Sequence, residues 1–97
     1  MAEDSVDDEN VESNLHSAGQ LLRRAREQKG LSLEDISKQT RIPNRHLASI
    51  ESGDFDALPG RTYAIGFAKS YARAVGLSDA SIGSQLRTEM DEQGHGA

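Results

Sequence analysis

Apolar residues in the stretch 31–53 recur at the spacing of one face of a helix, with a proline between two short runs. Ser32 precedes the first run and Asp35 follows three residues later, so each side chain can cap the other's backbone N–H at a helix start. A second helix is predicted to begin near Pro43, whose missing N–H costs nothing in a first turn, and to end at Gly53. Two helices joined by about three residues are typical of a helix-turn-helix unit.

Three further helices are predicted around this pair, at about 17–29, 61–75 and from Ser78 onward. The expected inner residues are apolar and spaced three or four apart. In the first and last helices they are Leu21, Leu22, Ala25, Ile82, Leu86 and Met90. The last three could instead pair two copies of the chain, but closing the core is favoured. Arg23, Arg24 and Arg26 are expected mostly on the outside, and Phe55 and Leu58 are expected to anchor a loop. The pattern predicts a compact all-α domain of five helices.

The two ends of the chain differ from this pattern. Residues 1–16 are acidic, lack aromatic residues and contain only isolated apolar positions, so we expect a disordered tail. A solvating extension is favoured over an interaction arm. The domain is predicted to span residues 17–91, followed by a disordered end at 92–97.

Charge is unevenly distributed over the 97 residues, whose net charge is −5. The tail holds six acidic residues and no lysine or arginine, whereas residues 17–77 carry ten basic and six acidic residues. This local excess of positive charge is mild for a protein held to DNA by phosphate contacts. The chain has no cysteine, no long apolar run and no basic leader, which indicates a soluble cytoplasmic protein without a disulfide framework.

Catalytic chemistry has little support in the sequence. His16, His46 and His95 are scattered and show neither metal-ligand spacing nor a pairing of nucleophile and base. Asp54 and Asp56 flank an apolar residue in a loop, where turn chemistry explains them better than a carboxylate pair does. We therefore expect no enzyme activity, no cofactor and no metal site.

The second helix of the unit carries residues that could contact DNA. Its N-terminal half carries Asn44, Arg45 and His46, and asparagine and arginine are suited to bidentate contacts with adenine and guanine. The small side chains of Ala48, Ser49 and Ser52 would let this helix approach DNA closely. Against this, Glu34 and Asp35 would repel phosphate at the start of the supporting helix. A solvated helix start is an equally good interpretation of the polar residues.

Three of the four aromatic residues recur every four positions on the fourth predicted helix: Tyr63, Phe67 and Tyr71. At this spacing they share one side of the helix. They could simply face the core, which is the favoured interpretation. The same helix has a second apolar set, however, so part of the aromatic stripe could bind a protein partner. Lys69 and Arg73 would rim such a surface.

The stretch 31–53 resembles the phage-repressor (XRE-type) helix-turn-helix, and FDALPGRTYAIGFAKSYARAVGL at 55–77 resembles the cytoplasmic N-terminal domain of RodZ, a bacterial cell-shape protein. The resemblance covers about residues 19–86. It implies a lambda-repressor-like five-helix fold that binds the actin-like filament protein MreB and links it to the membrane. Family members reach the membrane through a further segment, which does not follow Ala97 in this sequence. A non-enzymatic adaptor is therefore expected, with a sequence-specific transcriptional regulator as the alternative.

The resemblance also assigns residues. In the Tyr-Ala-x-Gly-Phe pattern, Tyr63 and Phe67 take the MreB-contact role, with Tyr71, Lys69 and Arg73 as weaker candidates. DNA-binding relatives commonly have a phosphate-holding glutamine where Leu33 stands and a glycine where Arg41 stands. Leu33 cannot make that hydrogen bond. A left-handed Arg41 would cost about 1–2 kcal/mol relative to glycine, unless the turn has another shape.

Overall fold

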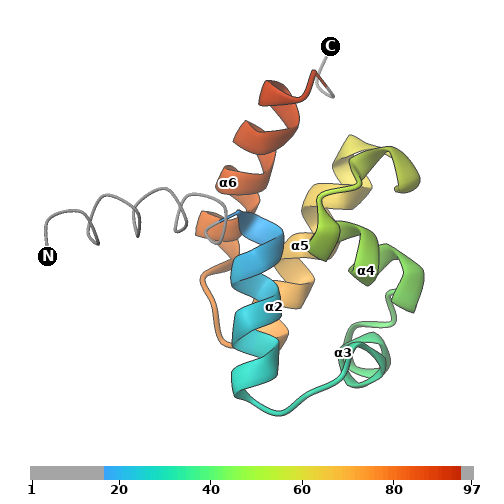
Figure 1. The fold of residues 1–97 in the computed structure, drawn as a ribbon, viewed down its shortest axis with the longest axis vertical. Coiled ribbons are helices and arrows are strands. Elements are labelled where there is room, and N and C mark those ends of the chain that lie inside the picture. The colour runs from blue at the N-terminus through green and yellow to red at the C-terminus, as the bar shows by residue number, and fades with distance from the viewer. Residues whose placement is uncertain (1–16, 95–97) are drawn as a thin grey trace, which may run out of the picture.

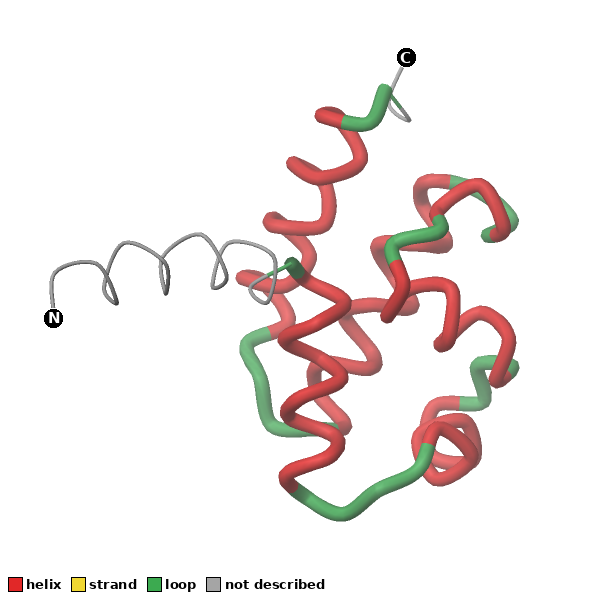
Figure 2. Tube along the Cα trace, viewed as in Figure 1, coloured by secondary structure: helices red, strands yellow, loops and turns green. Residues whose placement is uncertain are grey.

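Five α-helices and one 3-10 turn make up residues 17–94, the part of the chain that this computed structural model describes (Figure 1). In chain order they are α2 (Ala18–Gln28), α3 (Leu33–Thr40), α4 (Asn44–Ser52), η1 (Phe55–Ala57), α5 (Arg61–Ala74) and α6 (Asp79–Glu92). Figure 2 shows helices joined by short loops and no strand within this part of the chain. The all-α five-helix prediction is confirmed, whereas the predicted tail at 1–16 lies outside the described residues.

The helix boundaries follow the capping signals in the sequence. Ser32 accepts a hydrogen bond from the Asp35 N–H at 3.0 Å, and the Ser32 N–H donates to the Asp35 carboxylate at 2.9 Å, so the predicted capping box is present. Ser78, where the last helix was predicted to start, is the N-cap of α6, and its side chain accepts a hydrogen bond from the Ser81 N–H. Gly53 ends α4 with a φ of 77°, a conformation that glycine adopts without a Cβ clash. Local chemistry therefore sets these ends.

The turn between α3 and α4 keeps a left-handed residue at Arg41, with φ 64° and ψ 24°. No other non-glycine residue among 17–94 has a positive φ. The turn is held from both sides, because the Arg41 N–H donates to the Ser37 carbonyl at 2.7 Å and the Ser37 hydroxyl donates to the Ile42 carbonyl at 2.6 Å. The turn therefore keeps a left-handed arginine, at a conformational cost of about 1–2 kcal/mol.

The core lies between α5 and the other helices. α5 packs mainly along α6, and α4 contacts α2, α3 and α5. Ile82, Leu86 and Met90 are all buried within the chain, so the core interpretation of this stripe is confirmed. Phe55 and Leu58 are buried and anchor the loop after α4, also as predicted.

The backbones of α2 and α4 meet at Gly19. A Cβ at this position would lie 2.2 Å from the Ile50 carbonyl oxygen and 2.6 Å from that of Glu51. Both obstacles are backbone atoms of α4 and cannot rotate away. Gly19 therefore permits the close contact that fixes α4 against α2.

Arg26 departs from the predicted outward orientation, although Arg23 and Arg24 are exposed. Its guanidinium donates to the Glu51 carboxylate, with Nε–Oε2 at 2.9 Å, and to the Leu31 carbonyl at 2.9 Å. The side chains of Arg26 and Glu51 are only 13% and 10% exposed. Helical periodicity cannot predict this orientation, because the partner that draws Arg26 inward, the mostly covered Glu51, lies on another helix.

Candidate partner-binding surface

The aromatic stripe of α5 divides along the helix. Tyr63 is 59% exposed and is the exposed large hydrophobic residue of the described chain, Phe67 is half-buried, and Tyr71 has no exposed surface. The Tyr71 hydroxyl instead donates to the Glu51 carboxylate and accepts a hydrogen bond from Arg26 Nε. The expected partner contact at Tyr71 does not fit this burial, because its whole side chain fills the core. Tyr63 and Phe67 remain on the surface.

A third ring joins these two from α4. The His46 and Phe67 rings stack with centroids 5.5 Å apart and planes 18° apart, and the Tyr63 and Phe67 rings lie 5.9 Å apart at 48°. We call His46, Phe67 and Tyr63 the aromatic platform. Nδ1 of His46 is buried and has no hydrogen-bond partner among the described residues, so this edge of the ring packs like an apolar group. The platform thus bridges the second helix of the helix-turn-helix unit and α5.

The sequence pattern groups His46 with the DNA-contacting residues and does not reveal its contact with Phe67. The two residues lie on different helices, so no periodicity within one helix relates them. Only the crossing of α4 and α5 brings the rings together.

Lys69 and Arg73 do not rim the platform, contrary to expectation. At about 100° per residue, Lys69 lies about 160° around α5 from Phe67. Its aliphatic stem covers Gly83 of α6, where an added Cβ would lie 3.1 Å from the Lys69 Cγ. Arg73 Nη1 binds the Asp79 carboxylate at 2.7 Å, and this hydrogen bond lowers the pKa of Asp79. Lys69 therefore packs against α6, and Arg73 is tied to the start of α6 through Asp79.

The outward face of α4 is polar and open. Asn44 and Arg45 are exposed, and their side chains form no hydrogen bond or ion pair with the described residues. Ser49 is less available, because its hydroxyl donates to the Arg45 carbonyl at 2.9 Å. A helix that presents these groups could read base edges in a major groove.

Acidic side chains lie among the basic ones near this face. Glu34 and Asp35 are exposed in the first turn of α3. Hydrogen bonding from the Ser32 backbone lowers the pKa of the Asp35 carboxyl. Lys38 lies 3.9 Å from the Glu34 carboxylate. The surface beside α4 is therefore mixed in charge, whereas DNA contact favours a continuous basic face.

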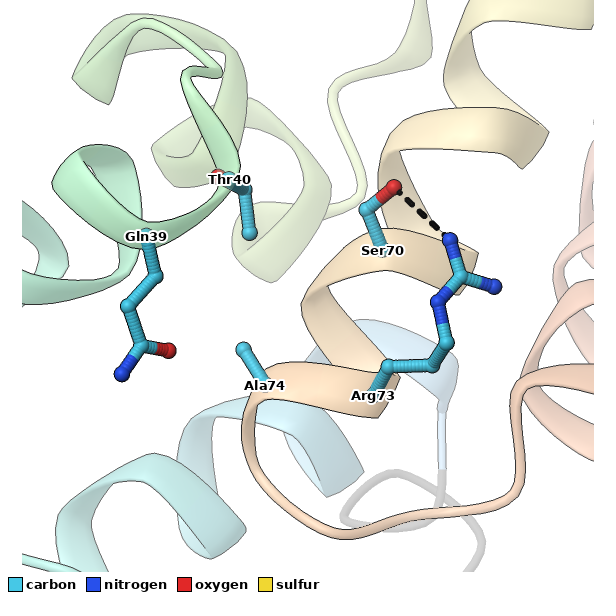
Figure 3. Close-up of a pocket in the computed structure, with 5 residues that line it drawn as sticks. All are labelled: Gln39, Thr40, Ser70, Arg73 and Ala74. Carbon is cyan, nitrogen blue, oxygen red and sulfur yellow. Dashed lines mark hydrogen bonds between the residues drawn. The ribbon is translucent and has the colours of Figure 1, made fainter.

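A shallow depression of about 510 Å³ lies between the end of α3 and the C-terminal half of α5 (Figure 3). Its lining is mostly polar and consists of Gln39, Thr40, Ser70, Arg73 and Ala74. Figure 3 shows Gln39 on one side of Ala74 and Arg73 on the other, with the Arg73 guanidinium hydrogen-bonded to Ser70.

Comparisons with known proteins agree with this architecture. A family model described as a helix-turn-helix domain matches residues 21–82. The chain is 46% identical over 64 residues to the cytoskeleton protein RodZ of Streptococcus pneumoniae, and 34% identical over 65 residues to the membrane protein YmfM of Bacillus subtilis. These alignments cover 66% and 67% of this chain but 23% of each relative. The chain thus spans about a quarter of the length of these relatives.

A solved structure also matches. It is that of YmfM from Staphylococcus aureus, described as a candidate DNA-binding membrane protein. The match has a TM-score of 0.70 and 30% identity, and covers 75% of this chain and 89% of that one. Among the described residues, no helix is both long and apolar enough to cross a membrane. The capped helix pair, the retained left-handed turn and these matches together show that the chain belongs to the helix-turn-helix domain family, as a RodZ-like N-terminal helix-turn-helix domain.

Proposed function

We propose that this chain is a cytoplasmic, non-enzymatic adaptor module that binds the actin-like filament protein MreB through the aromatic platform. The observation that supports this most directly is the exposure of Tyr63 beside the half-buried, stacked ring of Phe67. Aromatic rings that are fixed by their neighbours offer a large apolar area with little side-chain entropy left to lose on binding. The likeness to a cytoskeleton protein agrees with this class of partner.

The rings of the aromatic platform hold one another in place before any partner binds. Phe67 lies between the other two rings, so removing it leaves His46 and Tyr63 without their common support. Central, well-packed aromatic residues carry most of the binding energy in protein interfaces. The contact to the filament is therefore expected to centre on Phe67, with Tyr63 as the outer ring.

Co-sedimentation with polymerised MreB tests this assignment. Phe67→Ala should weaken binding by at least about tenfold, as expected for a central aromatic contact. Tyr63→Ala should also weaken binding, and its exposed side chain can be removed without opening the core. Thr62→Ala, at the exposed neighbouring position of α5, is the matched control and should bind normally. Unchanged binding by both aromatic variants would reject the site.

The second candidate function is sequence-specific DNA binding through α4. It is supported by the exposed, unpaired side chains of Asn44 and Arg45 and by the description of the YmfM structure. The left-handed Arg41 adds another exposed cation beside α4. The acidic groups at the start of α3 and the engaged hydroxyl of Ser49 weigh against it.

A gel-shift titration separates the two functions. A regulator should prefer one DNA sequence and lose affinity steeply as the salt concentration rises. Arg45→Ala should reduce the binding free energy that discriminates the base pair contacted by Arg45 by about 1–3 kcal/mol. The adaptor should show no sequence preference at physiological salt. Tyr63→Ala serves as the converse control, because Tyr63 is exposed on α5 and its removal leaves Asn44, Arg45 and the His46–Phe67 stack in place.

A further inference from the structure

The side of α5 that carries the aromatic platform continues toward the depression beside α3. At about 100° per residue, positions 63, 67, 70 and 74 fall within about 60° of one another on this helix. Tyr63 and Phe67 belong to the platform, and Ser70 and Ala74 line the depression. The two features are therefore successive parts of one surface, with Phe67 and Ala74 separated by about 10 Å along the helix axis.

We propose that the partner-binding surface extends from the aromatic platform into this depression, where it receives an acidic side chain of the same filament protein. The inference rests on the proposed function and specifies the chemistry of the partner. An apolar side chain would cover Phe67, and a carboxylate about 10 Å away would enter the depression. This separation corresponds to about seven residues on a helix or three on a strand.

Hydrogen-bond donors dominate the depression. The Ser70 hydroxyl accepts from Arg73 Nη2 at 3.2 Å, and among the described residues its own proton has no acceptor. The Gln39 side chain is exposed and likewise makes no hydrogen bond there. Thr40 offers little, because its hydroxyl already donates to the Ile36 carbonyl at 2.7 Å. A carboxylate accepts bonds only, so it matches this set of donors.

The surrounding charge also favours an acidic group. Arg73 lies at one edge, and its side chain in the pair with Asp79 is 58% exposed, so solvent and a partner can both reach it. Arg41 and Lys38 are exposed on the segment that forms the opposite wall. Asp79 offsets part of the Arg73 charge, so the attraction at this edge should be moderate.

The experiment measures filament co-sedimentation of the full chain with Arg73→Ala, Gln39→Ala and Asp79→Asn. Arg73→Ala should weaken binding about fivefold, the usual scale for an exposed charge pair, and should flatten the salt dependence. Gln39→Ala should have a smaller effect in the same direction. Asp79→Asn is the matched control: it breaks the Arg73–Asp79 pair but keeps the guanidinium, so binding should be unchanged or tighter.

Three results would overturn the inference. If Arg73→Ala and Gln39→Ala bind normally while Phe67→Ala does not, the platform stands and the extension is wrong. If Asp79→Asn weakens binding as much as Arg73→Ala, the effect comes from the lost ion pair and not from a partner carboxylate. If the unmodified chain does not bind the filament, the proposed function and the extension both fail.

Discussion

The hydroxyl of Tyr71 donates a hydrogen bond to the carboxylate of Glu51 inside the domain, and thereby links α5 to the end of α4. Arg26 completes the network from α2, with Nε 3.1 Å from the Tyr71 hydroxyl. Three helices are thus joined through polar side chains. Tyr71 and Phe67 are one turn apart on α5, yet one holds the helices together and the other faces the surface.

Tyr71→Phe should destabilise the domain by about 1–3 kcal/mol, because it removes a hydrogen bond from a carboxylate that is only 10% exposed, without creating a large cavity. Chemical denaturation with and without the substitution measures the difference. The substitution keeps the aromatic ring and its volume, so α5 should retain its packing and the proposed binding to MreB should persist in the folded variant. An unchanged midpoint of unfolding would show that the network contributes nothing to stability.

Stability should also fall in strong alkali. Burial, followed by the hydrogen bond to Glu51, raises the pKa of Tyr71 above its ordinary value of 10.0. As pH rises, the Tyr71 hydroxyl loses its proton in the unfolded chain before it does so in the folded chain. Its contribution to the free energy of unfolding is therefore complete below about pH 10 and is lost as pH rises toward the folded-state pKa. The midpoint of unfolding, followed upward from pH 9, should decline more steeply in the unmodified chain than in Tyr71→Phe. Parallel curves would contradict this assignment.

Gly19→Ala should be severely destabilising, by more than about 3 kcal/mol, because the new Cβ would overlap two backbone carbonyls of α4. Gly66→Ala provides the contrast. Gly66 is exposed in the middle of α5, and an added Cβ meets no atom within 4 Å, so this change should stabilise by about 0.5–1 kcal/mol. Thermal melts of both variants test the pair, and equal effects would refute the close packing of α2 on α4.

Arg41→Gly should stabilise the domain by about 1 kcal/mol, because it relieves the left-handed strain at an exposed side chain. Glycine also raises the conformational entropy of the unfolded chain, and this offsets part of the gain in stability. Gln39→Gly, within α3, should instead destabilise by roughly 0.5–1 kcal/mol. Urea midpoints for the two variants should move in opposite directions, and a loss of stability in both would mean that Arg41 is not strained.

Much of the fold could be predicted because its signals are local. The Ser32–Asp35 box, the Ser78 cap and the glycine at 53 each act within a few residues, so they set helix ends before any tertiary contact forms. The inner stripe of α6 likewise follows from helical period alone. The candidate surface was harder to predict from the sequence. The four-residue spacing of Tyr63, Phe67 and Tyr71 does not show which of them is exposed and which is buried.

The helices, their approximate boundaries and the helix-turn-helix unit could be read from the sequence, because capping and periodicity operate over a single turn. The left-handed conformation of Arg41 became clear only in the structure, since the sequence also allowed a turn of another shape. Three contacts depend on the tertiary structure: the buried Tyr71 bonds to Glu51, Arg26 turns inward, and His46 stacks on Phe67. Each of these depends on the distance and angle at which two helices cross. Those quantities come from packing across the whole core, starting from the contact at Gly19, and no short stretch of sequence specifies them.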